Sequence, residues 1–183
     1  MKAIDHVPLP DDSQIPPHIL EELKKYPPLN IHRLLTWVPE CWESWMNFMH
    51  GIYLTDFNPK LREIAICRYG FKNAAKYELF QHVPLALKSG VSQRELDILR
   101  SESPVVSLLD EENFVCRVVD EFEDLAGLSE PTFQELLSRY ETRKAMQLLM
   151  ILGHYCCVTR VLNATRLPCE AVSPLQHFAS PAG

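Results

Sequence analysis

Two side chains with acid–base chemistry stand four residues apart near the middle of the chain, in the segment Ala-Lys-Tyr-Glu-Leu-Phe-Gln-His at residues 75–82. They are Glu78 and His82, and on a helix this spacing places them on one face. A carboxylate and an imidazole that share a face can pass a proton between them. Glu63 lies in the preceding apolar-rich segment, from which a second carboxylate can join the pair. The spacing therefore indicates proton-transfer chemistry.

Each of these residues also has a structural interpretation. A single histidine is more often part of the core than of an active site, and Glu78 can be a solvated helix residue that pairs with it. Glu63 precedes the apolar run 64–67, and a carboxylate that enters an apolar wall is costly unless it is paired. It can orient His82 and act as an acid with a raised pKa, or form a salt bridge with a basic neighbour. The basic neighbours are Lys60, Arg62 and Arg68.

The segment resembles the motif of the carboxymuconolactone decarboxylase family, which includes the alkylhydroperoxidase D-like proteins. Redox-active members carry a Glu and, after a gap, Cys-x-x-Cys-x-x-x-His. On this template Glu63 and His82 keep their types. Ala75 and Glu78 occupy the two cysteine positions, and Tyr77 stands where many redox members have a second histidine. Disulfide exchange needs an attacking and a resolving thiol, so the chain is closer to the decarboxylase-like branch, which lacks the cysteine pair.

The resemblance implies a fold, an assembly and a reaction. Further segments that match in family order are Pro39, residues 61–63, residues 90–92 and residues 153–163. The implied protein is an all-α, single-domain helical bundle of the alkylhydroperoxidase D-like type that forms a homo-oligomer, as a dimer, trimer or hexamer. It is expected to act on a small organic acid or lactone without a cofactor or metal, by decarboxylation, elimination or isomerisation.

The resemblance also implies roles for individual residues. His82 would donate the proton and Glu63 would hold its tautomer. Arg62 would bind the substrate, and Arg62 or Tyr77 would stabilise developing negative charge, although Tyr77 can equally be a core aromatic. Glu78 would repel an anionic substrate, so it is expected to act as a second base or to be structural.

Two other functions stay open. One is an antioxidant, peroxidase-like protein that uses a thiol outside the motif, such as Cys67. The other is a non-catalytic scaffold or binding subunit. A metal site is disfavoured, because Glu63, Glu78 and His82 give three ligands at most and the chain has neither Cys-x-x-Cys nor His-Glu-x-x-His.

The composition is that of one globular domain, with 183 residues of which 46% are hydrophobic and 23% charged. The net charge of −6 argues against nucleic acid or an anionic membrane as a partner. Residues 1–17 lack the apolar core of a signal peptide, and the apolar stretch 148–158 is shorter than the roughly 20 residues of a membrane span. We therefore predict a cytoplasmic protein whose six cysteines are reduced.

The chain divides into a Pro-rich N-terminal arm (residues 1–28), a helical domain (residues 29–172) and a mobile tail (residues 173–183). The arm holds one short helix at about residues 18–25 and packs either on a neighbouring subunit or on its own domain. The first long helix of the domain carries an apolar stripe typical of a core or a subunit interface, formed by Trp42, Trp45, Met46 and Met49. The arm and the stripe together favour a homo-oligomer.

Capping residues predict where the helices around the motif begin and end. Asn58 and Pro59 start a helix that Gly70 ends. Asn73 caps the next helix, in which Pro84 produces a kink or an early end.

Farther along, Ser92 and Glu95 form a capping box, and Asp110 caps another helix. The last helix, at about residues 142–164, is the most apolar and is expected at the centre of the fold. His154 and Tyr155 lie within it and are interpreted as core residues with polar partners. No alternation of period two appears, so we predict an all-α bundle of roughly eight helices.

Overall fold

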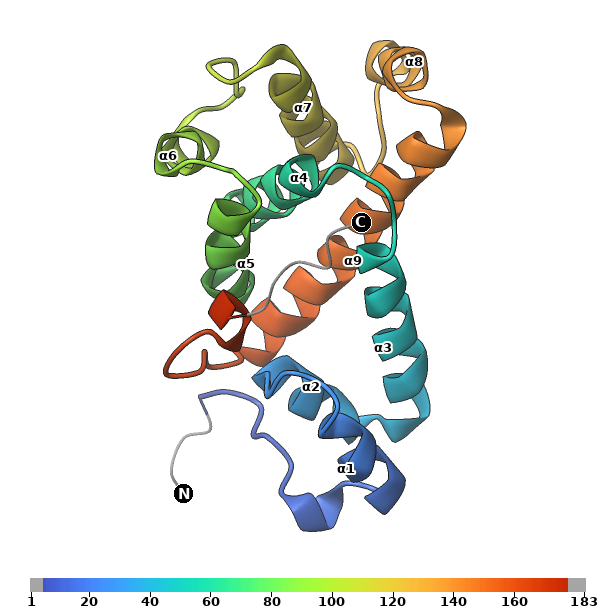
Figure 1. Cartoon of the computed structure of the whole chain (residues 1–183), viewed down its shortest axis with the longest axis vertical. Helices are drawn as coiled ribbons and strands as arrows, with labels where there is room; N and C mark the ends of the chain where they lie inside the picture. Colours follow the sequence, from blue (N-terminus) through green and yellow to red (C-terminus); the bar gives the residue numbers. More distant parts are fainter. Residues whose placement is uncertain (1–4, 178–183) are drawn as a thin grey trace.

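The computed structural model describes residues 5–177, and within this range it consists of helices without strands (Figure 1). The prediction of an all-α fold is confirmed. The nine α-helices of the described residues are α1 (Pro17–Leu23), α2 (Asn30–Leu34), α3 (Pro39–Tyr53), α4 (Pro59–Lys72), α5 (Lys76–Lys88), α6 (Gln93–Ser101), α7 (Asp110–Asp124), α8 (Glu130–Arg139) and α9 (Thr142–Thr165). Three short 3-10 helices are η1 (Asp12–Gln14), η2 (Leu35–Trp37) and η3 (Pro174–His177).

Two helices form the centre of the fold. Every residue of α4 from Leu61 to Gly70 is buried, and α4 contacts α5, α6, α7 and α9. Helix α9 runs through the molecule with α4 and α5 on one side and α3 on the other (Figure 1). Its central position is as predicted. Among the described residues, α9 alone is long and apolar enough to cross a membrane, but 56% of its most apolar window is buried inside the fold, as in the core helix of a globular protein.

The turn between α4 and α5 brings the two helices of the motif together. The predicted end at Gly70 is wrong, because α4 runs through it. Gly70 instead lets Leu79 of α5 approach closely, since a Cβ there would lie 2.9 Å from Leu79 Cδ2. The turn follows, with Ala74 in the left-handed region at φ 49°. Asn73 is not the cap of α5; it closes α4, and its Nδ2 donates to the Tyr69 carbonyl oxygen at 3.1 Å.

Some of the other predicted helix boundaries are confirmed and some are not. The Asn58 side chain accepts hydrogen bonds from two backbone N–H groups of the first turn of α4, as predicted. The capping box of Ser92 and Glu95 is also confirmed. Asp110 is the first residue of α7 rather than its cap, which is Leu109. The early end considered for α5 does not occur, because the helix continues past Pro84 to Lys88.

The described part of the N-terminal arm packs on its own domain. Ile15 and Ile19 join Trp42 and Met46 of α3 in one buried cluster. Trp42 and Met46 are only 3% and 1% exposed, so the chain itself covers much of the stripe that favoured an oligomer. The predicted helix of the arm is α1, and it begins at Pro17.

The segment that follows α9 returns to α5. Glu170 accepts hydrogen bonds from the Tyr77 hydroxyl at 2.6 Å and from Gln81 Nε2 at 2.5 Å. Ser173 is buried, and its hydroxyl donates to Gln81 Oε1 at 2.6 Å. The prediction of a mobile tail from residue 173 is therefore wrong for residues 173–177, because they are packed against α5. The rest of that predicted tail, residues 178–183, lies outside the described residues.

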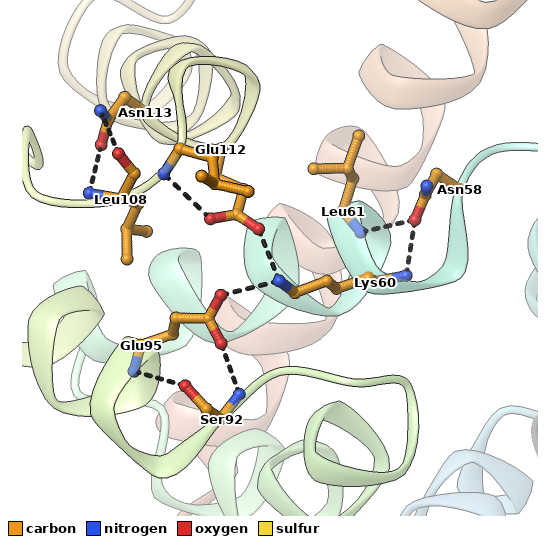
Figure 2. Close-up of polar contacts among 9 residues, drawn as sticks. Asn58, Lys60, Leu61, Ser92, Glu95, Leu108, Glu112 and Asn113 are labelled. Atoms are coloured by element: carbon orange, nitrogen blue, oxygen red, sulfur yellow. Dashed lines mark hydrogen bonds and ion pairs between the residues drawn. The ribbon is translucent and has the colours of Figure 1, made fainter.

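A partly buried ionic contact joins three helices around the start of α4 (Figure 2). Lys60 Nζ lies 2.7 Å from Glu95 Oε1 of α6 and 2.6 Å from Glu112 Oε1 of α7. Glu112 also accepts the Leu109 N–H, and only 4% of its surface is exposed. One ammonium group therefore bridges two carboxylates and offsets part of the repulsion between them.

Lys60→Met should lower the free energy of unfolding by roughly 2 kcal/mol, because Glu112 would stay buried without its cation. Urea unfolding at pH 7 measures this change. Lys24→Met is the matched control, because the Lys24–Glu21 pair is 64% and 68% exposed and contributes little. Equal stabilities of the two variants would contradict the prediction.

Candidate functional site

The three motif residues meet around one imidazole. His82 Nδ1 lies 2.9 Å from Glu63 Oε2, and His82 Nε2 lies 3.6 Å from Glu78 Oε2. All three side chains are at least nine-tenths buried. The structure therefore brings together the residues that the sequence analysis singled out, with one carboxylate at each ring nitrogen.

Helices α4 and α5 position these groups. Glu78 and His82 lie one turn apart on α5, as their spacing requires. The turn at residues 73–75 reverses the chain so that α4 packs along α5, which places Glu63 opposite His82. Pro84 follows two residues later but leaves this turn of α5 helical.

Glu63 divides its two oxygens between two partners. Oε2 accepts a hydrogen bond from His82 Nδ1, and Oε1 accepts one from Arg62 Nε at 3.2 Å. The other basic neighbours pair elsewhere, since Arg68 binds Asp120 and Lys60 binds α6 and α7. Glu63 therefore makes both the contact that orients His82 and the salt bridge to a basic neighbour. Its carboxylate holds the proton of His82 on Nδ1, and Nε2 faces Glu78.

The electrostatics of the cluster raise the pKa values of both His82 and Glu78, so each group holds its proton more tightly. Burial lowers the pKa of His82, but the charge and hydrogen bond of Glu63, together with the charge of Glu78, outweigh burial and leave the pKa raised. Burial raises the pKa of Glu78, the charge of Glu63 adds to this rise, and His82 opposes it. Because two groups with raised pKa values face each other, they titrate as a pair and can exchange one proton.

His82 and Glu78 line a cavity of about 230 Å³. Glu63 does not line it, although the proposed proton transfer led us to expect all three residues in one cavity wall; it contacts His82 Nδ1, on the side of the ring opposite Glu78. Arg62 does not line it either, and its predicted contact with substrate is not supported. The reason is packing: Arg62 is 1% exposed, and its guanidinium turns to Glu63 and lies over the Tyr53 ring, 4.7 Å from the centroid.

Tyr77 lines the cavity, but its hydroxyl is already engaged. It donates to Glu170 Oε1 at 2.6 Å and accepts the Ile31 N–H at 3.2 Å. Both bonds tie α5 to segments outside the motif. The predicted role of Tyr77 in stabilising developing negative charge therefore does not fit the geometry, and the residue acts as a structural link in the cavity wall.

A different tyrosine pair presents hydroxyl groups at the cavity. The Tyr53 and Tyr155 hydroxyl oxygens lie 2.8 Å apart, both residues line the cavity, and the Tyr155 ring meets the His82 ring edge-on at 5.0 Å. Within such a pair one O–H donates to the other oxygen. No further acceptor for the second O–H is found among the described residues, so one hydroxyl proton stays available to a bound molecule.

Sequence reasoning missed Tyr53 and read Tyr155 as a core residue. The two are 102 positions apart on α3 and α9, so no spacing rule relates them. The only signal in the sequence was a polar group inside an apolar run, which needs a partner when buried.

Three more imidazoles line the cavity, and two of them, those of His32 and His154, are buried, whereas His50 is exposed. His32 and His154 are 2% and 4% exposed. Burial lowers the pKa of each to about 4. His154 packs against the rings of Trp45, Phe48 and Tyr155 rather than forming the hydrogen bond expected of a core histidine. Both imidazoles are therefore neutral at pH 7, in contrast to His82, whose pKa is raised.

Neither the thiols nor the possible metal ligands form a redox or metal centre at this cavity. All six cysteines are free, and none lines this cavity. Cys67 is fully buried, and burial raises its pKa well above the ordinary value, which disfavours the thiolate. Glu63 and Glu78 contact opposite nitrogens of His82, so these three side chains do not converge on one point where an ion would bind.

Comparison with solved structures identifies the fold. A peroxidase-related protein of uncharacterised function from Ralstonia eutropha superposes with a TM-score of 0.75 at 14% identity, covering 93% of this chain and 95% of that one. It is described as an alkylhydroperoxidase AhpD core. An uncharacterised peroxidase-related protein from a Silicibacter species gives a TM-score of 0.74 at 16% identity, covering 92% of each chain.

A third structure comes from Agrobacterium tumefaciens and is provisionally described as an antioxidant defence protein of the AhpD type. Its TM-score is 0.67 at 14% identity, with 73% of this chain and 92% of that one covered. No protein-family model and no curated protein matches the chain. At such low identities the likeness establishes a shared fold and leaves the chemistry to the site itself.

Proposed function

We propose that this chain, which has the alkylhydroperoxidase D-like fold, is an enzyme that moves protons on a small carbonyl compound with its own side chains. One observation carries the proposal: His82 is buried between two carboxylates and, together with Glu78, lines a largely apolar cavity. A buried imidazole with a raised pKa beside a carboxyl group with a raised pKa is suited to general acid–base catalysis near neutral pH.

Each group has a distinct part in this reaction. Glu63 holds the proton on His82 Nδ1 and so fixes which nitrogen faces the substrate. Glu78 as carboxylate removes a proton from the carbon beside the substrate carbonyl, and His82 Nε2–H returns a proton at another atom. The available hydroxyl of the Tyr53–Tyr155 pair donates to the carbonyl oxygen as negative charge develops there.

This set of groups supports isomerisation, elimination or the protonation of a carbanion left by CO₂ loss. Such reactions belong to isomerases and lyases, and they agree with the decarboxylase-like branch that the motif resembles. The proposal places Glu78 as a base rather than a structural residue, because its carboxyl group lines the cavity and its pKa is raised. The predicted homo-oligomer stays a prediction.

Solvent deuterium exchange tests the proposed function. In D₂O the wild-type protein should exchange the α-protons of cyclic ketones, from cyclohexanone to 2-tetralone, faster than buffer alone, as followed by NMR. Glu78→Gln should return the rate to that of buffer, because the amide keeps the shape of the side chain but is no base. Glu22→Gln, on the exposed surface of α1, is the control. Exchange at the buffer rate for every ketone would overturn the proposal.

Peroxidase activity is expected at background with a hydroperoxide and a dithiol reductant. The two motif thiols are replaced by Ala75 and Glu78, and Cys67 is both buried and held as a thiol. Peroxide consumption coupled to oxidation of the dithiol measures this activity. Steady turnover that is lost in Cys67→Ser or Cys156→Ser would contradict the prediction and favour the antioxidant function.

A further inference from the structure

We infer that the cavity binds an uncharged, largely apolar carbonyl compound of one or two rings, and not the organic acid expected from the motif. The inference rests on the proposed function in taking this cavity as the substrate site, but it concerns binding rather than turnover. The charge, the shape and the polar groups of the cavity support it separately.

The charges around the cavity disfavour an anion. Among the described residues that line it there is no Lys or Arg, and the one carboxyl group, Glu78, would repel a carboxylate. Arg62 does not line it, is 1% exposed and pairs with Glu63. His82 already faces two carboxylates, one at each ring nitrogen. A carboxylate bound here would therefore lose its hydration without gaining a cation of its own.

The walls are apolar and aromatic. Six aliphatic side chains line the cavity, namely Leu29, Ile31, Met49, Leu85, Val158 and Leu175. A cavity of about 150 Å³ holds benzene. The volume of about 230 Å³ therefore suits a ligand slightly larger than one aromatic ring.

Four of the polar side chains that line the cavity form one cluster. Glu78, His82 and the Tyr53–Tyr155 pair are linked by short contacts, since His82 meets Glu78 through Nε2 and Tyr155 through its ring edge. A ligand that places one oxygen on this cluster can leave the rest of its surface on the aliphatic wall. A ketone, enol or phenol has this distribution of polarity.

Calorimetric titration with a matched pair of probes tests the inference at pH 7. The probes are 2-naphthol, which is neutral, and 2-naphthoate, which has the same ring system and a carboxylate. We expect 2-naphthol to bind roughly tenfold or more tightly than 2-naphthoate, because only the anion must lose hydration without a cation. Equal or tighter binding of 2-naphthoate, or binding of neither probe, would overturn the inference.

Two variants locate the binding. Val158→Trp fills the cavity and should abolish 2-naphthol binding, whereas Val106→Trp, on an exposed side chain away from this cavity, should leave it unchanged. Circular dichroism verifies that both variants fold. Because a Val158→Trp protein that fails to fold gives no answer, Leu175→Trp provides a second substitution in the cavity wall. Binding that persists in a folded cavity variant would overturn the inference. Selective binding of 2-naphthol without any ketone exchange would contradict the proposed function and still support this inference.

Discussion

His82→Gln should slow ketone α-proton exchange by roughly 10²–10⁴-fold, the usual contribution of a general acid or base. The amide can still donate to Glu63 and fill much of the space, but it cannot carry the proton that Glu78 and the substrate exchange. His18→Gln, on an exposed side chain of α1, should exchange at the wild-type rate. The measurement is NMR of the ketone in D₂O for the three proteins side by side.

Glu63→Gln separates a positioning role from a purely structural one. The charge and hydrogen bond of Glu63 raise the pKa of His82 against the effect of burial. Removing that charge should therefore lower the pKa of His82, and the exchange rate should begin to fall at a lower pH as the protonated imidazole is lost. An NMR titration of the imidazole measures the shift directly.

Unfolding measurements check that both variants stay folded. Each variant should lose up to roughly 3–5 kcal/mol, because it breaks a buried ion pair on one side whether or not the pair is catalytic. The exchange rates of the folded variants therefore decide the catalytic role. Exchange at the wild-type rate in His82→Gln would refute the assignment of His82.

Acid should destabilise the protein strongly between pH 6.5 and pH 4. His32 and His154 have pKa values lowered from 6.5 to about 4 by burial. In this window the unfolded chain binds a proton at each histidine and the folded chain does not, so stability falls as the pH falls. Each histidine contributes a loss of roughly 3 kcal/mol by pH 4, at about 1.4 kcal/mol for each pKa unit. Two such losses are a large share of the roughly 5–15 kcal/mol of a typical domain.

The other titrating groups of the site act differently in this window. His82, with its raised pKa, is protonated in both states below pH 6.5, and its stabilisation is lost only as the pH rises through its folded value. Glu78, with its raised pKa, binds its proton more readily in the folded state and offsets part of the acid loss. The histidine contribution is therefore isolated by comparing variants at each pH.

Urea unfolding of wild type and His154→Phe at pH 7, 5.5 and 4.5 measures the effect. Phenylalanine keeps the ring contacts with Trp45 and Phe48 but cannot bind a proton, so the variant should lose less stability on acidification. His18→Gln should follow the wild type, because His18 is exposed. Equal pH dependence of wild type and His154→Phe would refute the prediction.

The features that the sequence determined by itself depend on neighbours within a few residues. Asn58 caps α4 and Ser92 joins Glu95 in a capping box, because each bond closes within the first helical turn. Glu78 and His82 share a face because 3.6 residues make one turn. The absence of any alternating pattern predicted the all-α fold, and the order of the motif residues predicted its alkylhydroperoxidase D-like type, which the superposed structures bear out.

Short-range rules failed where a distant segment decided the outcome. Gly70 resembled a helix stop, yet the close approach of Leu79 explains its presence inside α4. Residues 173–177 were predicted to be a mobile tail. In the structure Ser173 binds Gln81 of α5, and Gln81 also binds Glu170, so the segment lies against α5. In both cases the energy that selects the conformation comes from packing between elements, which local propensity does not contain.

The site residues also divide into those that the sequence predicted and those that only the tertiary structure revealed. The sequence alone selected Glu63, Glu78 and His82, since their types and spacing carry the chemistry. Only the tertiary structure decided which way each side chain points. In the folded chain Arg62 pairs with Glu63 and does not line the cavity. The Tyr77 hydroxyl binds Glu170, and the Tyr53 hydroxyl binds that of Tyr155, 102 residues away. The physical reason is that hydrogen bonds and burial act through space, so a partner far along the chain leaves no mark on the local pattern.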